Sequence, residues 1–342
     1  MSLASLSVSP STSTPRIPGL GFAAGFVGIA ILAAVMSGTL PIQFAIATVF
    51  LFAGPHNWLE ARYALGRLPA RAGKLRGFFL VSLTGIVGLT SSYAALPWLT
   101  QEYTTPAEVG TVYAIWNSVF VFWIATLIWM RSRTNPRFDG GWVWPAACLL
   151  CAGVWLNPIA LNVALVYVHP LMALWLLDRE LTRSRPAWRR AYRRVVGCIP
   201  LLLGVLWWHL RDAAELPGTD QLTGINTVSI IQHSGAWFLE GISAHFLVAA
   251  HTFLEMVHYG VWVLLIPLIG MRAMPWELHT IPAARRSPTW RRGVSLFLLF
   301  GLCVVLVMWV SFGLDYSTTR RVYFSFAMLH VLAEVPFLLR MV

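Results

Sequence analysis

The sequence predicts an all-α, polytopic transmembrane bundle of about ten spans, and its composition, hydrophobic runs and loop charges all lead to this fold class. Hydrophobic residues make up 57% of the 342 residues, only 11% are charged, and the mean hydropathy is +0.67. A soluble domain carries about 25% charged residues, so this composition excludes a single soluble core. The 19 Phe, 17 Trp and 9 Tyr residues suit a protein that meets lipid headgroups at several interfaces.

Ten hydrophobic runs follow a short polar tail. Residues 1–18 are rich in Ser, Thr and Pro, which predicts a disordered N-terminal tail. Residues 19–342 are predicted to form a single transmembrane helical domain, because a helix needs about 20 apolar residues to cross the hydrocarbon core. Runs of suitable length lie at 19–39, 41–65, 77–98, 109–130, 141–157, 158–180, 195–210, 243–271, 293–313 and 320–341.

Loop charges support this count and set the orientation. The net charge of +11 comes mostly from arginines in short loops, so it indicates membrane orientation and not nucleic-acid binding. The positive-inside rule places both termini in the cytoplasm, as expected of a multi-pass protein of the bacterial inner membrane. Basic loops around 66–76, 131–137, 179–194 and 272–292 alternate with acidic loops at 99–108 and 211–232.

The stretch 234–271 is too long for one span and too short for two spans joined by a loop. We expect residues 234–243 to lie at the outer interface, with the crossing after them. A re-entrant element that lines a cavity is the alternative.

Three copies of one spacing, His-x-x-x-Glu, occur within the apolar runs. Nine His and nine Glu in 342 residues give about 0.24 such pairs by chance. Positions i and i+4 of a helix share one face, so each motif directs an imidazole and a carboxylate to the same side. The three motifs are His56–Glu60, His251–Glu255 and His330–Glu334.

Ionisable side chains inside a membrane are costly and mark functional sites. Imidazoles and carboxylates on several helices build the sites of helical di-iron proteins, and sets with open positions suit non-haem Fe(II) chemistry with dioxygen. The alternative for each motif is a hydrogen-bonded pair that neutralises a buried carboxylate. The predicted cofactor is non-haem iron, as one ion or two. The predicted ligands, all on helices of one direction, are His56, Glu60, His169, His251, Glu255, His258, His330 and Glu334.

The segment Phe52–Glu60 (FAGPHNWLE) resembles the Pro-His-Gly-x-x-Asp signature of the Brp/Blh-type membrane β-carotene dioxygenases. Those proteins are all-helical, His-rich and polytopic, are described as holding iron through intramembrane His, and cleave carotene to retinal. The resemblance implies that His56 is an iron ligand, with Glu60 in place of the family's Asp. It also implies that the region 251–258 takes the part of a later His cluster. Asn57 stands where the family has Gly, and the similarity covers about ten residues of 342.

The leading hypothesis is a membrane-embedded non-haem metal oxygenase or oxidoreductase. Its substrate is lipophilic (a carotenoid, isoprenoid, acyl chain or quinone), because the site is reached through the bilayer. The partners are then the lipid bilayer and this small molecule, with a larger membrane complex as a further partner. Three alternatives stay open: a b-type haem or quinone-linked electron carrier, a proton- or metal-coupled transporter, and a structural subunit of a membrane complex.

Other polar residues are predicted to have structural roles. Asn117, Asn157 and Asn162 lie in apolar runs and are interpreted as residues that form interhelical hydrogen bonds. His233 lies in a loop, where a titratable side chain needs no special account. Arg320 is interpreted as part of a helix start, and residues 183–194 as a basic amphipathic patch that contacts anionic headgroups.

Overall fold

The computed structural model describes residues 19–69, 71–100, 105–134, 139–220, 222–270 and 276–341. Within these residues the regular structure is helical, apart from one isolated bridge between Thr219 and Asn226. The prediction of an all-α chain is therefore confirmed. The predicted disordered tail, residues 1–18, lies outside the described residues.

The helices follow one another with short connections. Two short 3-10 turns, Gly73–Leu75 and Leu278–Thr280, precede α3 and α12, and a π-helical turn, Val261–Leu265, joins α10 to α11. In chain order the α-helices are α1 (Gly19–Thr39), α2 (Pro41–Arg67), α3 (Arg76–Leu99), α4 (Pro106–Thr134), α5 (Val143–Leu156), α6 (Ala160–Ser184), α7 (Pro186–Val195), α8 (Cys198–Leu210), α9 (Val228–His233), α10 (Ala244–Gly260), α11 (Ile266–Gly270), α12 (Pro288–Leu314) and α13 (Tyr316–Met341).

Eight helical segments of the described chain are long and apolar enough to cross a membrane, so the chain is a multi-pass membrane protein. All ten hydrophobic runs lie on helices, but α2 and α5 do not meet this criterion. Helix α2 carries several polar residues between its apolar ones. Helix α5 has 14 residues, and about 21 Å at 1.5 Å per residue is short for a core about 30 Å thick. The run at 195–210 is extended by α7 into the segment Pro186–Leu210.

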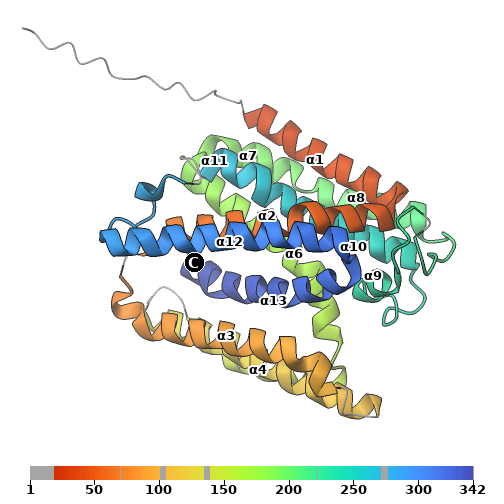
Figure 1. The fold of residues 1–342 in the computed structure, drawn as a ribbon, viewed down its shortest axis with the longest axis horizontal. Helices are drawn as coiled ribbons and strands as arrows, with labels where there is room; N and C mark the ends of the chain where they lie inside the picture. Colours follow the sequence, from red (N-terminus) through yellow and green to blue (C-terminus); the bar gives the residue numbers. More distant parts are fainter. Residues whose placement is uncertain are drawn as a thin grey trace, which may run out of the picture.

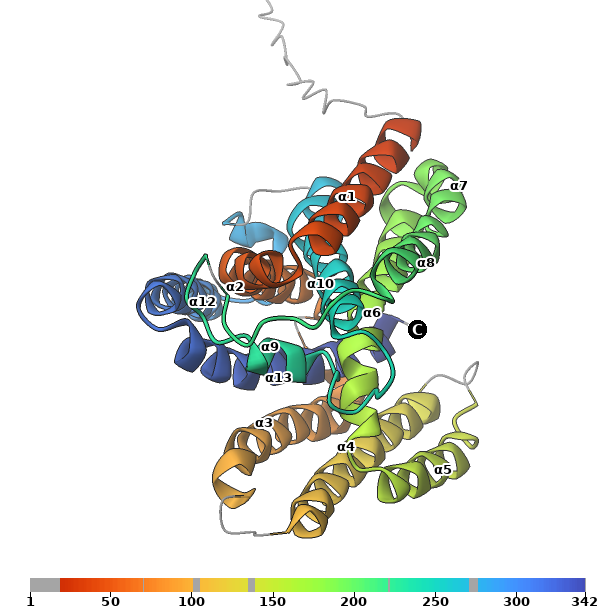
Figure 2. The same cartoon turned by 90° about the vertical axis from the view of Figure 1, so that its right-hand side faces the viewer.

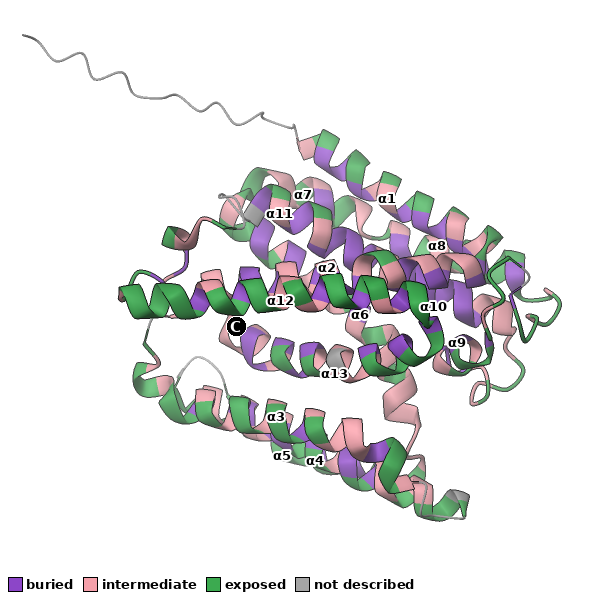
Figure 3. Ribbon diagram, viewed as in Figure 1, coloured by how far each residue is buried: buried purple, intermediate pink, exposed green. Residues whose placement is uncertain are grey.

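The helices form three groups, which are clearest in Figure 2. Helices α1, α7 and α8 pack on one side of a central group made of α2, α6, α10, α12 and α13, while α3, α4 and α5 lie on the other side (Figure 1). The segment Ala244–Ile269, which begins with α10, is the most buried of the candidate spans: 67% of its most apolar stretch lies inside the protein. Exposed apolar side chains such as Leu299, Phe300 and Val310 cover the outer face of α12, as expected of a surface in contact with lipid (Figure 3).

The two ends of the bundle differ in charge. At one end Arg340 Nη1 donates to the carbonyl of Arg67 at 2.5 Å, and Phe22 near the start of α1 stacks on Trp188 of the basic helix α7. At the other end Gln43 Nε2 donates to Asp220 Oδ1 at 2.5 Å. The first and last described helices thus begin and end at the basic end of the bundle.

The segment 234–243 contains turns, and the buried helix begins only at Ala244, where the Ser243 hydroxyl accepts from the Phe246 amide. The helix thus begins directly after residues 234–243, where the crossing was expected to begin, and the location of 234–243 at the outer interface stays a prediction. Helix α10 then ends at Gly260, which packs against α1 so closely that a Cβ there would lie 2.9 Å from Ile29 Cγ2. The π-helical turn starts directly after this contact, and such turns are frequent next to functional sites.

Candidate metal centre

A cavity of about 510 Å³ lies among α2, α3, α4, α6, α9, α10 and α13. Most of its lining is apolar, but imidazoles from five helices face it. They form two sets. The four-histidine cluster consists of His56, His169, His258 and His330, and a second set, the His233–His251 group, lies elsewhere on the cavity wall.

Prolines interrupt three of the helices that carry the four-histidine cluster. Pro55 precedes His56 on α2, and Pro170 follows His169 on α6. Pro336 lies two residues after Glu334 on α13. Because proline lacks an N–H and clashes with the carbonyl four residues earlier, each of these helices is free to bend next to the cluster.

His56 and His258 are held in the same way, by a backbone carbonyl on Nδ1. His56 Nδ1 lies 3.2 Å from the Phe52 carbonyl, and His258 Nδ1 lies 3.3 Å from the Pro170 carbonyl. Since a carbonyl oxygen can only accept, Nδ1 carries the proton in both rings and Nε2 carries the lone pair. Metal-ligating histidines are oriented by this type of contact. His258 Nε2 is buried and has no hydrogen-bond partner among the described residues.

His330 and His169 face each other through their Nε2 atoms, which lie 3.2 Å apart. On the opposite side of each ring stands a carboxylate: Glu60 Oε2 is 2.8 Å from His330 Nδ1, and Glu334 Oε2 is 3.3 Å from His169 Nδ1. A carboxylate next to Nδ1 favours a proton there, which leaves both Nε2 lone pairs pointing at each other. Such a contact requires either a proton on one of the two Nε2 atoms or a metal ion between the rings.

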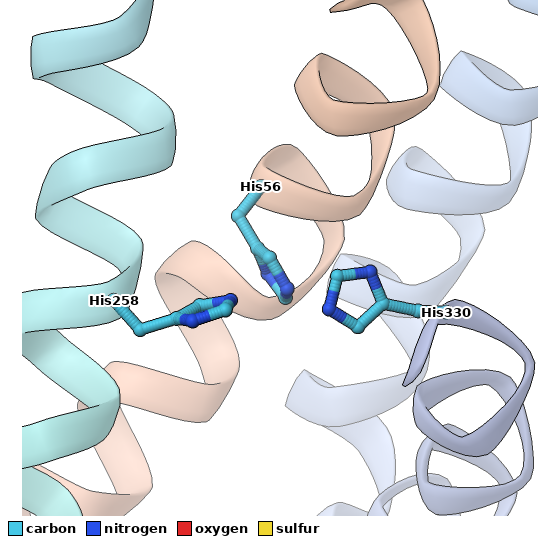
Figure 4. Close-up of side chains that lie close together, drawn as sticks. All are labelled: His56, His258 and His330. Carbon is cyan, nitrogen blue, oxygen red and sulfur yellow. The ribbon is translucent and has the colours of Figure 1, made fainter. Parts of the chain in front are cut away.

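The geometry of the cluster suits a metal ion. Figure 4 shows His56, His258 and His330 converging from α2, α10 and α13. One donor nitrogen from each of these three lies within 4.8 Å of the others, and His169, His330 and Glu334 form a second such group. Two nitrogens at about 2.1 Å from one ion lie roughly 3.0–3.4 Å apart at octahedral or tetrahedral angles, and the 3.2 Å between His169 and His330 falls in this range.

The charges agree with this geometry. Glu60 and Glu334 are both buried, and each has a carboxylate oxygen next to the Nδ1 of an imidazole. Buried charges must be paired or bind metals. A divalent cation held by neutral imidazoles balances two carboxylates, so the six side chains can form an electrically neutral unit around one ion.

The structure brings together the first and third of the predicted motifs, but it pairs them between helices. Glu60 contacts His330 and not His56 of its own motif, and Glu334 contacts His169. The spacing places both groups of a motif on one face of a helix. The bundle brings that face against a neighbouring helix, whose imidazole is the nearer partner.

The second motif lies apart from the four-histidine cluster. His251 is next to His233 of α9, with ring centroids 5.1 Å apart, and Glu255 Oε1 accepts from the Tyr259 hydroxyl at 3.0 Å. His251 and Glu255 line the same cavity, but no group of ligand atoms joins them to the cluster among the described residues. The structure therefore does not place His251 and Glu255 in one ligand set with the other six predicted ligands.

Four residues near the site were missed or assigned a lesser role by the sequence analysis. His233 lines the cavity, and burial together with nearby His251 and Arg320 holds the pKa of His233 well below its usual value. Arg320 is a buried side chain whose guanidinium lies 4.5 Å from the centroid of Phe324, and not an exposed helix start. Two tyrosines, Tyr259 and Tyr323, join their hydroxyls at 3.2 Å.

Tyr259 connects the two polar sets of the cavity. Its ring lies 4.3 Å from the ring of His56, while its hydroxyl contacts Glu255 and Tyr323. The position directly after His258 is the sequence signal that could have identified it. Two of the asparagines make hydrogen bonds near the start of α6: Asn117 donates to the Pro158 carbonyl at 2.7 Å, and Asn157 Oδ1 accepts from the amides of Ile159 and Ala160. The third, Asn162, lines the cavity.

Comparisons of the chain with protein-family models, with curated proteins and with solved structures find no match. The functional argument therefore rests on the cavity and on the side chains around it.

Proposed function

We propose that this chain is a membrane-embedded non-haem metal oxygenase, with iron as the metal and a lipophilic molecule as the substrate. One observation carries the proposal: each of the four imidazoles has its Nδ1 next to a backbone carbonyl or a carboxylate, while its Nε2 is directed into the cluster. Outer partners on one nitrogen and a free lone pair on the other characterise histidines that bind metals.

In this proposal the Nε2 atoms of His56, His258 and His330, which form one group of ligand atoms, hold the ion, and His169 joins them through its contact with His330. Glu60 and Glu334 orient two of the rings and balance the charge. A non-haem Fe(II) ion with open positions supplies one-electron chemistry with dioxygen. The two carboxylates stay on the far side of their imidazoles. An ion held by these imidazoles would be accessible from the cavity, because all four of them line it.

The cavity supports a lipophilic substrate. Its volume of about 510 Å³ falls within the range of about 300–1,000 Å³ typical of small-molecule sites. Aliphatic and aromatic side chains of α3, α4, α6 and α13 form most of the wall, which suits a carotenoid, another isoprenoid or an acyl chain. For cleavage of a C=C bond, one O2 and one double bond give two carbonyls, so both oxygen atoms enter the products and no external reductant is needed.

The haem alternative receives less support. An axial pair of histidines requires a gap wide enough for a flat porphyrin between two Nε2 atoms. The rings of the cluster instead contact one another, with centroids 4.9–5.9 Å apart, and Nε2 atoms of His169 and His330 lie 3.2 Å apart. A porphyrin would have to displace these contacts.

A structural role is the second candidate, and the two His–Glu contacts favour it. A proton between His169 and His330, with one of the carboxyls protonated, also neutralises the cluster without any metal. This arrangement gives His258 Nε2 no partner, whereas a bound ion does. We also propose that the basic end of the bundle faces the cytoplasm, with the protein in the bacterial inner membrane.

The test is an oxygenation assay on the full chain in lipid nanodiscs, loaded with Fe(II) and given β-carotene under 18O2. We expect carbonyl products that carry 18O in the wild type and in His251→Ala, and none in His258→Ala. Products that are independent of His258, or a purified protein with a Soret band, would contradict the proposal. If β-carotene is inert, oxygen uptake with farnesol and with oleate decides between the remaining substrate classes, and no uptake with any of them counts against an oxygenase.

A further inference from the structure

A second cavity, of about 370 Å³, lies at the basic end of the bundle between α2, α6 and α13. We call it the basic pocket. Its walls carry four arginines and one glutamate, with few apolar side chains. The charged residues are Arg67, Arg179, Arg183, Arg340 and Glu180.

We infer that the basic pocket binds the phosphate headgroup of an anionic phospholipid. The four arginines and Glu180 give a formal charge of +3. Helices α2, α6 and α13 all end here, and three C-termini contribute about −1.5 in partial charge. These helix ends therefore offset only about half of the positive charge, and the remainder is available to attract an anion.

The contacts within the basic pocket agree with this charge balance. Glu180 is fully engaged, since it accepts from Arg67 Nη2 at 2.6 Å and from the Tyr63 hydroxyl at 2.5 Å. Arg340 donates to the Arg67 carbonyl and lies close enough to Arg183 for their charges to repel. Arg179 and Arg183 are exposed, four residues apart on one face of α6. Two guanidinium groups on one side of a pocket match the bidentate recognition of phosphate.

The ligand of the basic pocket is a separate molecule from the substrate of the metal centre. Tyr63 packs edge-on against Trp262 and Phe337, with centroids 5.6 and 5.9 Å away. This aromatic layer belongs to the main core. No residue lines both cavities. The inference is thus independent of the proposed oxygenase.

A lipid is favoured as the source of the phosphate because the pocket is formed by spanning helices. Arg67 lies seven residues after Glu60 on α2, and Arg340 six residues after Glu334 on α13, which is about 9–10 Å along each axis. The pocket is therefore near one end of the spans, at the depth of headgroups. Basic pockets between transmembrane helices on the cytoplasmic side bind anionic headgroups.

The experiment is native mass spectrometry of the full chain, purified in neutral detergent and titrated with phosphatidylglycerol. The pocket variant is Arg179→Gln with Arg183→Gln, and the matched control is Arg291→Gln with Arg292→Gln, two exposed arginines at the start of α12. We expect binding about 25-fold weaker in the pocket variant, roughly fivefold for each arginine near the membrane surface. The control should bind as the wild type does.

A second variant, Thr182→Glu, adds a negative charge to the wall and leaves every arginine in place. We expect it to weaken phosphatidylglycerol binding as well, with an unchanged melting temperature. Equal losses in pocket and control variants, or equal binding of phosphatidylcholine, would overturn the inference. Displacement of the lipid by millimolar inorganic phosphate would overturn the lipid as the source. Binding that persists in Thr182→Glu would also count against the basic pocket.

Discussion

Replacing Glu334 by Gln separates a metal centre from a purely structural cluster. Glutamine keeps the volume and an acceptor oxygen, so the contact with His169 Nδ1 can form again. What the substitution removes is one of the two buried negative charges. Without a metal the cost is that of an altered hydrogen bond, about 1–3 kcal/mol at most, and the protein is expected to stay folded in the membrane.

The magnitude of the metal effect follows from the distances. Glu334 Oε2 lies 3.3 Å from His169 Nδ1. The ring adds about 2 Å and a metal–nitrogen bond about 2.1 Å, so the carboxylate is roughly 7 Å from the ion. With an effective dielectric constant of about 20, a unit charge at roughly 7 Å attracts a divalent ion by about 5 kcal/mol. Relaxation of the protein and the dipole of the new amide recover part of this energy. Substitution of a residue that hydrogen-bonds to a metal ligand typically lowers metal affinity about 10–100-fold. For Glu334→Gln we expect a loss of about 100-fold in iron affinity.

The assay is metal content by mass spectrometry after equilibration of each variant in Fe(II) buffered by a chelator. Glu255→Gln is the matched control, because Glu255 belongs to the same type of motif but lies outside the four-histidine cluster. We expect Glu334→Gln to bind iron about 100-fold more weakly and Glu255→Gln to resemble the wild type. Equal affinities for Glu334→Gln and the wild type would refute the electrostatic reasoning.

Three further predictions follow from other parts of the molecule. His258→Ala should lose bound iron while His251→Ala retains it, as measured by metal content. Among the described residues His258 belongs to a group of ligand atoms and its Nε2 has no hydrogen-bond partner, whereas His251 belongs to no such group. The reverse result would move the site to the second group. Gly260→Ala should lower the unfolding temperature, because the added Cβ would lie 2.9 Å from a methyl group of α1. Overpacking of this kind costs about 1–3 kcal/mol, and an unchanged unfolding temperature would contradict the close packing. Hydrogen bonds from the side chain and amide of Thr223 lower the pKa of Asp220 below its ordinary value of 3.8, so this loop is stabilised at higher pH and loses that stabilisation as the pH falls through the lowered pKa. The protection factors of the loop amides, which are corrected for the intrinsic exchange rate at each pH, should therefore fall below about pH 4 in the wild type and much less in Asp220→Asn.

Sequence periodicity identifies the face of a helix but not the depth of a side chain in the bundle. His251 and His258 lie seven residues apart on α10, almost on one face. They were predicted to share one ligand set because both are ionisable residues within an apolar run. Two turns correspond to about 10 Å along the axis, whereas the donors of one ion lie within about 4 Å of one another. The helical spacing therefore predicts that both residues face the interior of the bundle, but it cannot show whether they belong to the same site.

The same limit explains the pairing of the carboxylates. The spacing of Glu60 and Glu334 predicts correctly that both face the interior, where the structure buries them. Their nearest imidazoles come from α13 and α6, and only the packing of three helices decides this. His233 was missed because the sequence places it in a loop, where a titratable side chain is expected to be exposed to solvent. Its place on the cavity wall depends on the fold of α9 across the end of the bundle.

Composition alone determines which segments of the chain become helices. Ten hydrophobic runs all become helices, since an apolar backbone segment in lipid must satisfy its own hydrogen bonds. Helix α2 fails a hydropathy criterion because it carries the polar residues of the candidate site, His56 and Glu60 among them. The polar residues that lower the hydropathy of α2 are thus the same residues that place it at the candidate site.

The most direct test of the metal centre is the metal content of the purified wild-type chain, combined with its absorption spectrum and iron X-ray absorption. We predict about one iron per chain, no Soret band, and a first shell dominated by imidazole nitrogen at about 2.1 Å. His258→Ala and Glu334→Gln should both reduce the iron content of the folded protein. A folded wild-type chain that binds no iron when it is supplied, or iron that persists in both variants, would contradict the assignment of the four-histidine cluster as a metal centre.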